Sequence, residues 1–268
     1  MTVTAQPRWR SASLAPHTAY LTGRLLRFTS RQPAFMAITL VQPMIWLLLF
    51  GQLFKRVVEI PGFASGSYVD FLTPGVVVMT VLFSSGWAGM AIIDDMDRGV
   101  LDRMLSSPVS RGAMMASSTV NQAVTIVVQS VIVVLVGLLL GGEFPGGVVG
   151  VLVMLLAAVL LGASFASLSN GMALLVRTSE SLIGFSTMLT LPLSFLSSAM
   201  MAREAAPAWI QTVSSYNPVD WAVVASRSAL SADPDWSAIL PRLGGLLVVA
   251  LVTVWLATRA FRTYQRSL

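Results

Sequence analysis

The sequence predicts an all-α membrane protein with six transmembrane helices, and three observations carry this prediction. Of 268 residues, 55% are hydrophobic and only 11% are charged, whereas a soluble domain carries about 25% charged residues. The apolar residues form stretches long enough to cross a bilayer, which takes about 20 residues. The charges fall between these stretches, as expected because a charge inside hydrocarbon is costly.

The predicted spans form a single domain over residues 34–262. It follows an N-terminal segment, 1–33, and precedes a short tail, 263–268. The spans are expected at residues 34–54, 71–93, 117–140, 148–176, 181–202 and 243–258. The fourth is too long for one straight crossing, and the last is short enough to need the arginines at its ends to extend it.

The distribution of basic residues predicts the topology. If the N-terminus is cytoplasmic, twelve arginines fall on the cytoplasmic side and five basic residues fall outside. Cytoplasmic loops of membrane proteins are enriched in Lys and Arg. We therefore expect both termini inside the cell. Sixteen arginines against one lysine are typical of a GC-rich bacterial genome, so we expect a bacterial plasma membrane.

Two segments outside the spans have amphipathic or broken apolar character. Residues 16–33 carry leucines at helical spacing with arginines between them, which favours a helix lying along the membrane surface. Residues 203–242 are apolar but are interrupted at Asn217-Pro218 and carry Asp220. We expect this second segment to form one or two short helices that re-enter the outer leaflet or cap the spans.

The chain is organised around the charged stretch at residues 94–111, which holds seven of its 29 charged residues between two apolar spans. Within it, Leu101, Met104 and Leu105 fall on one helical face. Pro108 is expected to end the helix, because the residue before a proline avoids the α region. The pattern predicts a short cytoplasmic surface helix whose apolar stripe needs a partner.

Several function classes are disfavoured by what the sequence lacks. It has no cysteine, its single histidine is His17, and its single lysine, Lys55, is not part of a phosphate-binding loop. The arginines flank apolar segments, which indicates membrane anchoring and not nucleic-acid binding. A membrane enzyme or assembly factor remains a remote alternative. The polar residues inside spans that such a function would use form no acid–base or metal set: Gln42, Asn121, Gln122, Gln129 and Asn170.

The order of short motifs resembles that of ABC exporter permeases of the ABC-2 type. The charged stretch contains Asp97-Arg98-Gly99, then a Leu-rich turn, then Ser107-Pro108-Val109-Ser110-Arg111. Many relatives have Glu where this chain has Asp97. After the fifth span come Leu196-Ser197-Ser198-Ala199, Pro207-Ala208-Trp209, Asn217-Pro218 and Arg227. The resemblance covers nearly the whole chain, and within the family the chain is most similar to the daunorubicin-resistance drug permeases.

The resemblance implies that the surface helix is a coupling helix seated in a groove of a separate ATPase subunit. Two ATPase copies would bind ATP and Mg²⁺, and this chain would hold no cofactor itself. A second permease chain, identical or homologous, would complete the transporter. The residues expected at the ATPase contact are Asp97, Arg98, Gly99, Leu101, Arg103, Met104, Leu105, Pro108 and Arg111.

The expected cargo is a hydrophobic or amphipathic compound, such as a drug or antibiotic, with a lipid-linked glycan or glycolipid as the alternative. Its path would be walled by the first, second and fifth spans. The residues suggested for it are Gln42, Phe185, Met188, Phe195 and Met200. Small residues at i, i+4 spacing in the fourth span predict close helix packing. They are Gly162, Ala166, Ser167 and Gly171.

Overall fold

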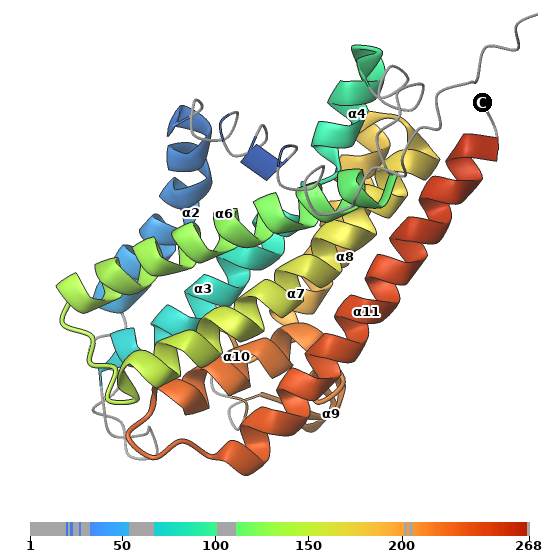
Figure 1. Cartoon of the computed structure of the whole chain (residues 1–268). Helices are drawn as coiled ribbons and strands as arrows, with labels where there is room; N and C mark the ends of the chain where they lie inside the picture. Colours follow the sequence, from blue (N-terminus) through green and yellow to red (C-terminus); the bar gives the residue numbers. More distant parts are fainter. Residues whose placement is uncertain are drawn as a thin grey trace, which may run out of the picture.

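The computed structural model describes residues 33–53, 67–100, 111–200 and 206–266, together with Tyr20, Thr22, Gly23, Arg27 and Arg203. These residues fold into helices, and no strand occurs among them (Figure 1). The helices are α2 (Pro33–Leu53), α3 (Tyr68–Gly86), α4 (Met90–Asp97), α6 (Arg111–Leu139), α7 (Gly147–Val176), α8 (Ser179–Phe195), α9 (Ala208–Ser214), α10 (Pro218–Leu230) and α11 (Trp236–Arg266).

Within the described residues, four stretches are long and apolar enough to cross a membrane. They are Tyr68–Asp97, Ser117–Leu139, Gly147–Val176 and Trp236–Phe261, and they coincide with four of the predicted spans. The apolar part of α2 that the structure describes is Leu40–Leu53, and α8 has 17 residues. The all-helical class is therefore confirmed, whereas the six-span count stays a prediction.

Four predicted spans differ in their bounds from the helices, and the third predicted span begins at Arg111 and not at residue 117. The second span was expected to be continuous but is interrupted at residues 87–89, between α3 and α4. The fifth was expected to reach residue 202 but ends at Phe195, because the side chains of Asn217, which caps α10, and of Asp220 bind the backbone that follows. The last begins seven residues before the predicted start, because the Asp235 carboxylate accepts hydrogen bonds from the Ser237 and Ala238 N–H groups.

Helix α7 is the centre of the bundle. It packs against α3, α6, α10 and α11. Its 30 residues form one unbroken helix, about 45 Å long at 1.5 Å per residue. The predicted fourth span is thus a single helix that exceeds the roughly 30 Å hydrocarbon thickness. Such a helix fits a bilayer by tilting or by extending beyond the hydrocarbon region.

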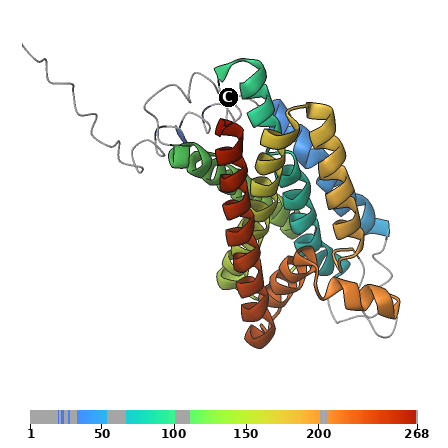
Figure 2. The ribbon, with the colours of Figure 1, turned by 90° about the vertical axis from the view of Figure 1, so that its right-hand side faces the viewer.

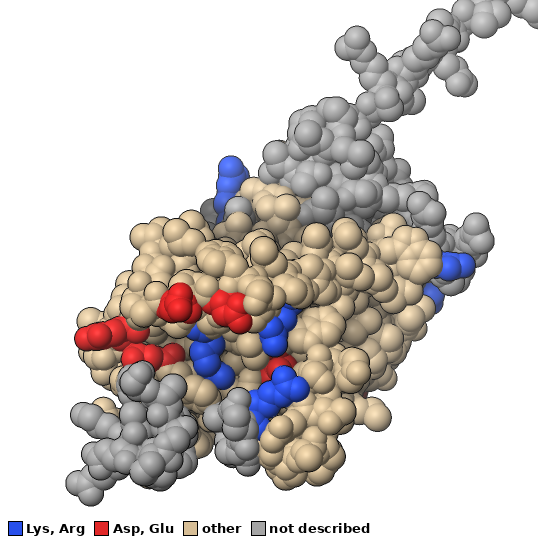
Figure 3. All heavy atoms as spheres, turned by 90° about the horizontal axis from the view of Figure 1, so that it is seen from below, with Lys and Arg blue, Asp and Glu red and all other residues tan. Residues whose placement is uncertain are grey.

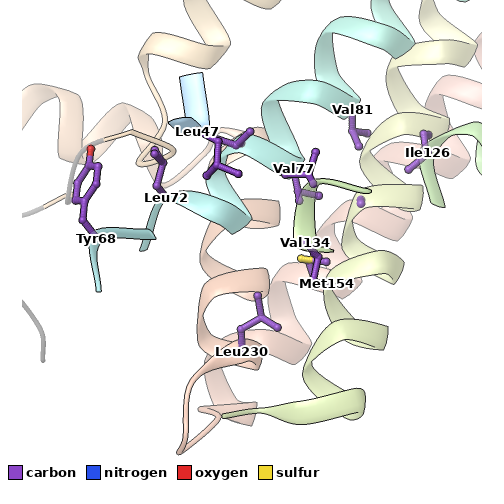
Figure 4. Close-up of a cluster of buried hydrophobic side chains, with 12 residues drawn as sticks. Leu47, Tyr68, Leu72, Val77, Val81, Ile126, Val134, Met154 and Leu230 are labelled. Carbon is purple, nitrogen blue, oxygen red and sulfur yellow. The ribbon is translucent and has the colours of Figure 1, made fainter. Parts of the chain in front are cut away.

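Two clusters of apolar side chains form the core. One joins α2, α3, α6, α7 and α10 and includes Leu47, Val77, Ile126, Met154 and Leu230 (Figure 4). The other joins α3, α7, α10 and α11 through residues such as Leu161. Because every long helix contributes to one of these clusters or packs against it, the bundle has a defined interior apart from any surrounding lipid.

The two ends of the bundle differ. Helix α4 and the C-terminal end of α11 lie at one end, and α9 and α10 lie at the other (Figures 1 and 2). The 203–242 segment contains the two short helices α9 and α10, whereas their placement in the outer leaflet stays a prediction. The face at their end carries charged side chains of both signs (Figure 3).

Candidate functional site

A cavity of about 530 Å³ lies between α2, α3, α6 and α8. Helices α2 and α8 both pack against α3 and form two of the cavity walls. The lining residues are Gln42, Pro43, Trp46, Gly75, Val76, Met79, Thr80, Phe83, Ser84, Trp87, Gln122, Thr125, Gln129, Thr187, Thr190, Leu191, Ser194, Phe195 and Met200. The lining is a mixture of aromatic, aliphatic and neutral polar groups.

Most lining hydroxyl groups donate to a carbonyl of their own helix. Thr80 Oγ1 donates to the Val76 carbonyl over 2.7 Å, and Thr190 Oγ1 donates to the Ser186 carbonyl over 2.7 Å. The hydroxyls of Ser84, Thr125 and Ser194 make equivalent bonds. A hydroxyl has one proton and two acceptor lone pairs. These groups therefore keep acceptor capacity after their proton is used.

None of the described residues that line the cavity carries a charge. Four aromatic rings contribute to the walls: Trp46, Phe83, Trp87 and Phe195. Trp87 and Phe195 are 46% and 78% exposed, so their rings are accessible to a ligand. The arrangement offers apolar contact and neutral hydrogen bonding but no acid–base pair. It is suited to binding a mainly apolar compound that makes a few hydrogen bonds.

The break between α3 and α4 adjoins the cavity, because Trp87 in the break is one of the lining residues. The Gly86 carbonyl accepts hydrogen bonds from Ser169 Oγ of α7 and from Ser186 Oγ of α8, both over 2.6 Å. Ser169 Oγ also accepts from the Gly89 N–H over 3.0 Å. Two neighbouring helices thus satisfy backbone groups that the break leaves unpaired.

Helix α4 packs onto the same two helices and leads into the charged stretch. Ile93 is 1% exposed and contacts a small cluster containing Ala173 of α7 and Leu182 of α8. Asp97 is the last residue of α4, Arg98 caps it, and Gly99 has φ +62°. The predicted coupling residues Leu101, Arg103, Met104, Leu105 and Pro108 lie outside the described residues. Arg111 begins α6.

The chain after α8 forms the second part of the site, since Met200 and Phe195 also line the cavity. Asn217 Nδ2 donates to the Leu193 and Leu196 carbonyls over 2.7 and 3.0 Å. Its Oδ1 accepts from the Val219 N–H and caps α10. One amide side chain therefore joins the end of α8 to the start of α10.

Two charged residues of α10 also bind the chain that follows α8. Asp220 is 1% exposed, and its Oδ1 accepts from the Ser198 N–H over 2.8 Å. The Arg227 guanidinium donates to the Phe71 carbonyl and to the carbonyls of Ser198 and Ala199. It also lies 3.6 Å from the centroid of the Phe71 ring. A planar guanidinium with five donors suits this combination of bonding and stacking.

The loop after α8, which contains Ala199 and Met200, packs directly on α3. A Cβ added at Gly75 would lie 2.0 Å from the Ala199 carbonyl oxygen. Tyr68 Oη donates to the Met200 carbonyl over 3.4 Å. The Ser-small element, Asn217 and Arg227, which the sequence placed in order along the chain, thus meet in space. The sequence singled out Asp220 only as a charge within an apolar segment, and its role in holding Ser198 was missed.

The predicted cargo residues divide into two groups. Gln42, Phe195 and Met200 line the cavity, whereas Phe185 and Met188 of α8 do not. Met188 is 82% exposed. Sequence reasoning missed Trp46, which follows Gln42 by one helical turn. It had considered Gln122 and Gln129 only as catalytic residues, although their spacing of seven places them on one helical face.

The small residues of α7 lie at helix contacts. A Cβ at Gly162 would lie 2.1 Å from Ile126 Cδ1 of α6 and 3.0 Å from Val81 Cγ1 of α3. A Cβ at Gly171 would lie 3.3 Å from Ala257 Cα of α11. Ala166 and Ser167 are 3% and 4% exposed. These positions therefore face the interior of the bundle.

The bundle of long apolar helices defines the class of protein as an integral membrane protein. The family model described as ABC-2 type transporter matches residues 17–231. The chain belongs to this family and is a multi-pass membrane protein. The resemblance seen in the order of the sequence motifs is thus confirmed.

Several characterised or named permeases are similar to the chain. A daunorubicin resistance ABC transporter permease protein from Streptomyces coeruleorubidus is 30% identical over 71% of this chain and 66% of its own length. A putative transport permease from Cyanophora paradoxa is 30% identical over 76% of this chain and 70% of its own. A probable doxorubicin resistance ABC transporter permease protein from Mycobacterium tuberculosis is 22% identical over 93% and 88%.

Proposed function

We propose that this chain is the transmembrane subunit of an ATP-driven exporter that moves a hydrophobic or amphipathic compound, such as a drug or antibiotic, out across a bacterial plasma membrane. The observation that carries the proposal is the family match over most of the chain, joined with relatives named for daunorubicin and doxorubicin resistance. The neutral, partly aromatic cavity supports the cargo class, because ligand sites for such compounds are mainly apolar with a few polar groups.

The structure suggests how an ATPase would act on the cavity. Residues 94–111 would form the contact with the ATPase, and α4 begins that stretch. The break at Gly86–Gly89 joins α4 to the helix that lines the cavity. A rigid-body displacement of α4 would therefore be delivered to Trp87, to α7 through Ser169 and to the α8 wall through Ser186.

The complete transporter would contain two ATPase subunits, which bind ATP and Mg²⁺, and a second permease chain. Both termini of this chain would face the cytoplasm together with α4. The predicted apolar stripe of Leu101, Met104 and Leu105 would seat in the ATPase groove. Asp97, Arg98, Arg103 and Arg111 would set its orientation, because charges at an interface fix register and partner choice.

A lipid-linked glycan or glycolipid is the second candidate cargo. Four aromatic rings beside neutral polar groups favour it, because aromatic faces suit sugar rings. Against it, a phosphate-linked carrier needs a cationic partner, and no described lining residue supplies one. The hydrophobic compound is therefore the first choice.

The experiment is co-purification of the tagged full-length chain with the ABC ATPase subunits of its host, followed by measurement of ATPase activity. The proposal expects wild type to retain an ATPase and the Leu101→Asp/Leu105→Asp double variant to lose it. Leu139→Asp is the control, since Leu139 is 85% exposed at the end of α6 and far along the chain from the charged stretch. Equal retention by the double variant would contradict the proposal.

A further inference from the structure

A second cavity, of about 350 Å³, lies at the α9–α10 end of the bundle. Its lining comes from both sides of α9, from α10 and from the first three turns of α11. It shares no lining residue with the cavity between α2, α3, α6 and α8. The face at this end carries charged side chains of both signs (Figure 3). The proposed transport function makes no use of this second cavity.

Two arginines line the second cavity, and neither forms an ion pair with an acidic residue that the structure describes. Arg203 donates to the Gln211 carbonyl, and Arg242 donates to the Ala238 carbonyl one turn earlier in α11. A guanidinium has five N–H donors. Most donors of both arginines therefore remain for a ligand, and their planar arrangement matches the oxygens of a carboxylate or a phosphate.

The charges around the cavity favour a ligand with a single negative charge. The third charged residue of the lining is Asp220, whose Oδ1 accepts a backbone N–H. Two guanidiniums against one carboxylate leave one positive charge in excess. Asp235 is also near, but a hydrogen bond from Ser237 lowers the pKa of the Asp235 carboxyl more than the charge of Arg242 does. Asp235 is thus engaged mainly at the start of α11 and does not line the cavity.

One wall of the cavity is an indole ring held at two points. Trp221 Nε1 donates to the Ser215 carbonyl over 2.7 Å. A Cβ added at Gly245 of α11 would lie 2.9 Å from Cζ3 of the same ring. The ring therefore packs closely between α10 and α11 and gives the cavity a fixed apolar side next to the two guanidiniums.

The position of the cavity along α11 corresponds to the level of lipid headgroups. Aromatic residues of the type that gathers at membrane interfaces are exposed at this end: Trp209, Tyr216 and Trp236. Pro241 and Gly245 of the lining share a helical face with Val248 and Val252, because the steps between them are four, three and four residues. Val248 and Val252 are 59% and 51% exposed. An exposed apolar face thus continues from the cavity along α11.

We propose that this cavity binds the phosphodiester group of an anionic phospholipid. Arg203 and Arg242 donate to the phosphate oxygens, and one acyl chain lies along Val248 and Val252. The group recognised is a phosphate oxyanion with one negative charge. A free phosphate ion shares this chemistry but makes no use of the apolar face of α11, which favours the lipid. The proposal does not depend on the transport function or on its cargo.

The test measures lipid binding to the purified, delipidated full-length chain in detergent micelles by native mass spectrometry. The probes are dioleoyl phosphatidylglycerol, dioleoylglycerol, which lacks the phosphate, and inorganic phosphate. We expect phosphatidylglycerol to bind about tenfold or more tightly than dioleoylglycerol, because hydrogen bonds to a charged group are the strong ones. Inorganic phosphate in equal amount should not displace it. Equal binding of dioleoylglycerol, or displacement by inorganic phosphate, would overturn the proposal.

Single substitutions test the two arginines. Arg242→Gln should weaken phosphatidylglycerol binding about tenfold without unfolding the chain, because the hydrogen bond shown for Arg242 stays within its own helix. Arg203→Gln should have a similar effect. Arg259→Gln is the matched control, since Arg259 is exposed near the opposite end of α11, and it should change binding less than twofold.

A second readout is the melting temperature in detergent with and without phosphatidylglycerol, since a ligand that binds the folded state stabilises it. The lipid should raise the melting temperature of wild type and of Arg259→Gln more than that of Arg242→Gln. Unchanged binding in both Arg242→Gln and Arg203→Gln would overturn the proposal. An equal loss in Arg259→Gln would also overturn it, because binding would then follow net charge alone.

Discussion

The Ser169 hydroxyl on α7 donates to the Gly86 carbonyl at the end of α3 over 2.6 Å. The same oxygen accepts the Gly89 N–H over 3.0 Å. One side chain therefore holds both sides of the break from which α4 departs. The contact is tight, because a Cβ at Gly89 would lie 2.5 Å from the Ser169 carbonyl oxygen. This relationship connects the charged stretch with the cavity.

Replacing Ser169 should destabilise the packing at the break between α3 and α4. We expect Ser169→Ala to lower the free energy of unfolding by about 1–3 kcal/mol, because the buried Gly89 N–H loses its acceptor. Thermal unfolding in detergent measures the change. Ser164→Ala is the matched control, since Ser164 is also buried on α7 but donates only to the Leu160 carbonyl of its own helix. A similar loss in both variants would mean that the break does not depend on Ser169.

The loop after α8 should depend on Arg227. We expect Arg227→Lys to lower stability by about 2 kcal/mol, because an ammonium cannot both bridge the carbonyls of Phe71 and Ser198 and stack on the Phe71 ring. Denaturant unfolding of the purified chain provides the measurement. Arg242→Lys serves as the control, as the one hydrogen bond shown for Arg242 is to the Ala238 carbonyl one turn away. Equal stability of the two variants would refute a special role for Arg227.

Two glycine-to-alanine substitutions should distinguish the effect of a tight interhelical contact from the effect of intrinsic helix propensity. Gly75→Ala is expected to destabilise the chain by roughly 1–3 kcal/mol, because the new methyl group meets the Ala199 carbonyl oxygen and must push the loop from α3. Gly184→Ala on α8 has no atom within 4 Å of the new carbon. It should instead stabilise its helix by about 0.5–1 kcal/mol. Melting temperatures that move in the same direction would contradict this assignment of the α3–loop contact.

Gln42 and Gln52 of α2 offer a matched test of the cavity in transport. Gln42 lines the cavity, and Gln52, which is also exposed, does not. We expect Gln42→Leu to reduce the apparent affinity for an amphipathic cargo about three- to tenfold, as expected for one lost hydrogen bond. Gln52→Leu should leave it unchanged. Concentration-dependent stimulation of ATPase activity gives the readout, and a parallel change in both variants would argue against a role of the cavity.

Features that depend on local sequence were predicted, whereas features that depend on contacts between residues far apart in the chain were not. The apolar stretches of α6 and α7 are local signals, and their helices were predicted within a few residues except at the N-terminus of α6. The α3–α4 break was not foreseen, because Trp87-Ala88-Gly89 contains no proline and is held by serines about 80 and 100 residues away. The early end of α8 has the same origin, since Asn217 and Asp220 hold its last turn and the loop from another helix.

The candidate site likewise combines features that the sequence predicts with features that only the fold reveals. Order along the chain placed Asn217 and Arg227 in one motif set, but only the fold shows that both bind the backbone after α8. Residue type suggested Met188 for the cargo path, yet helical phase turns it away from the cavity. Trp46 and Phe83 have no polar signature that would single them out from ordinary membrane residues.

The most direct test of the central claim is ATP-dependent uptake into inside-out membrane vesicles that contain the chain and its ATPase. The account predicts that a hydrophobic or amphipathic drug compound accumulates when ATP is added. Accumulation should be absent with a non-hydrolysable ATP analogue and with Leu101→Asp/Leu105→Asp. Uptake that proceeds without ATP, or that a proton uncoupler abolishes while ATP is present, would contradict an ATP-driven permease.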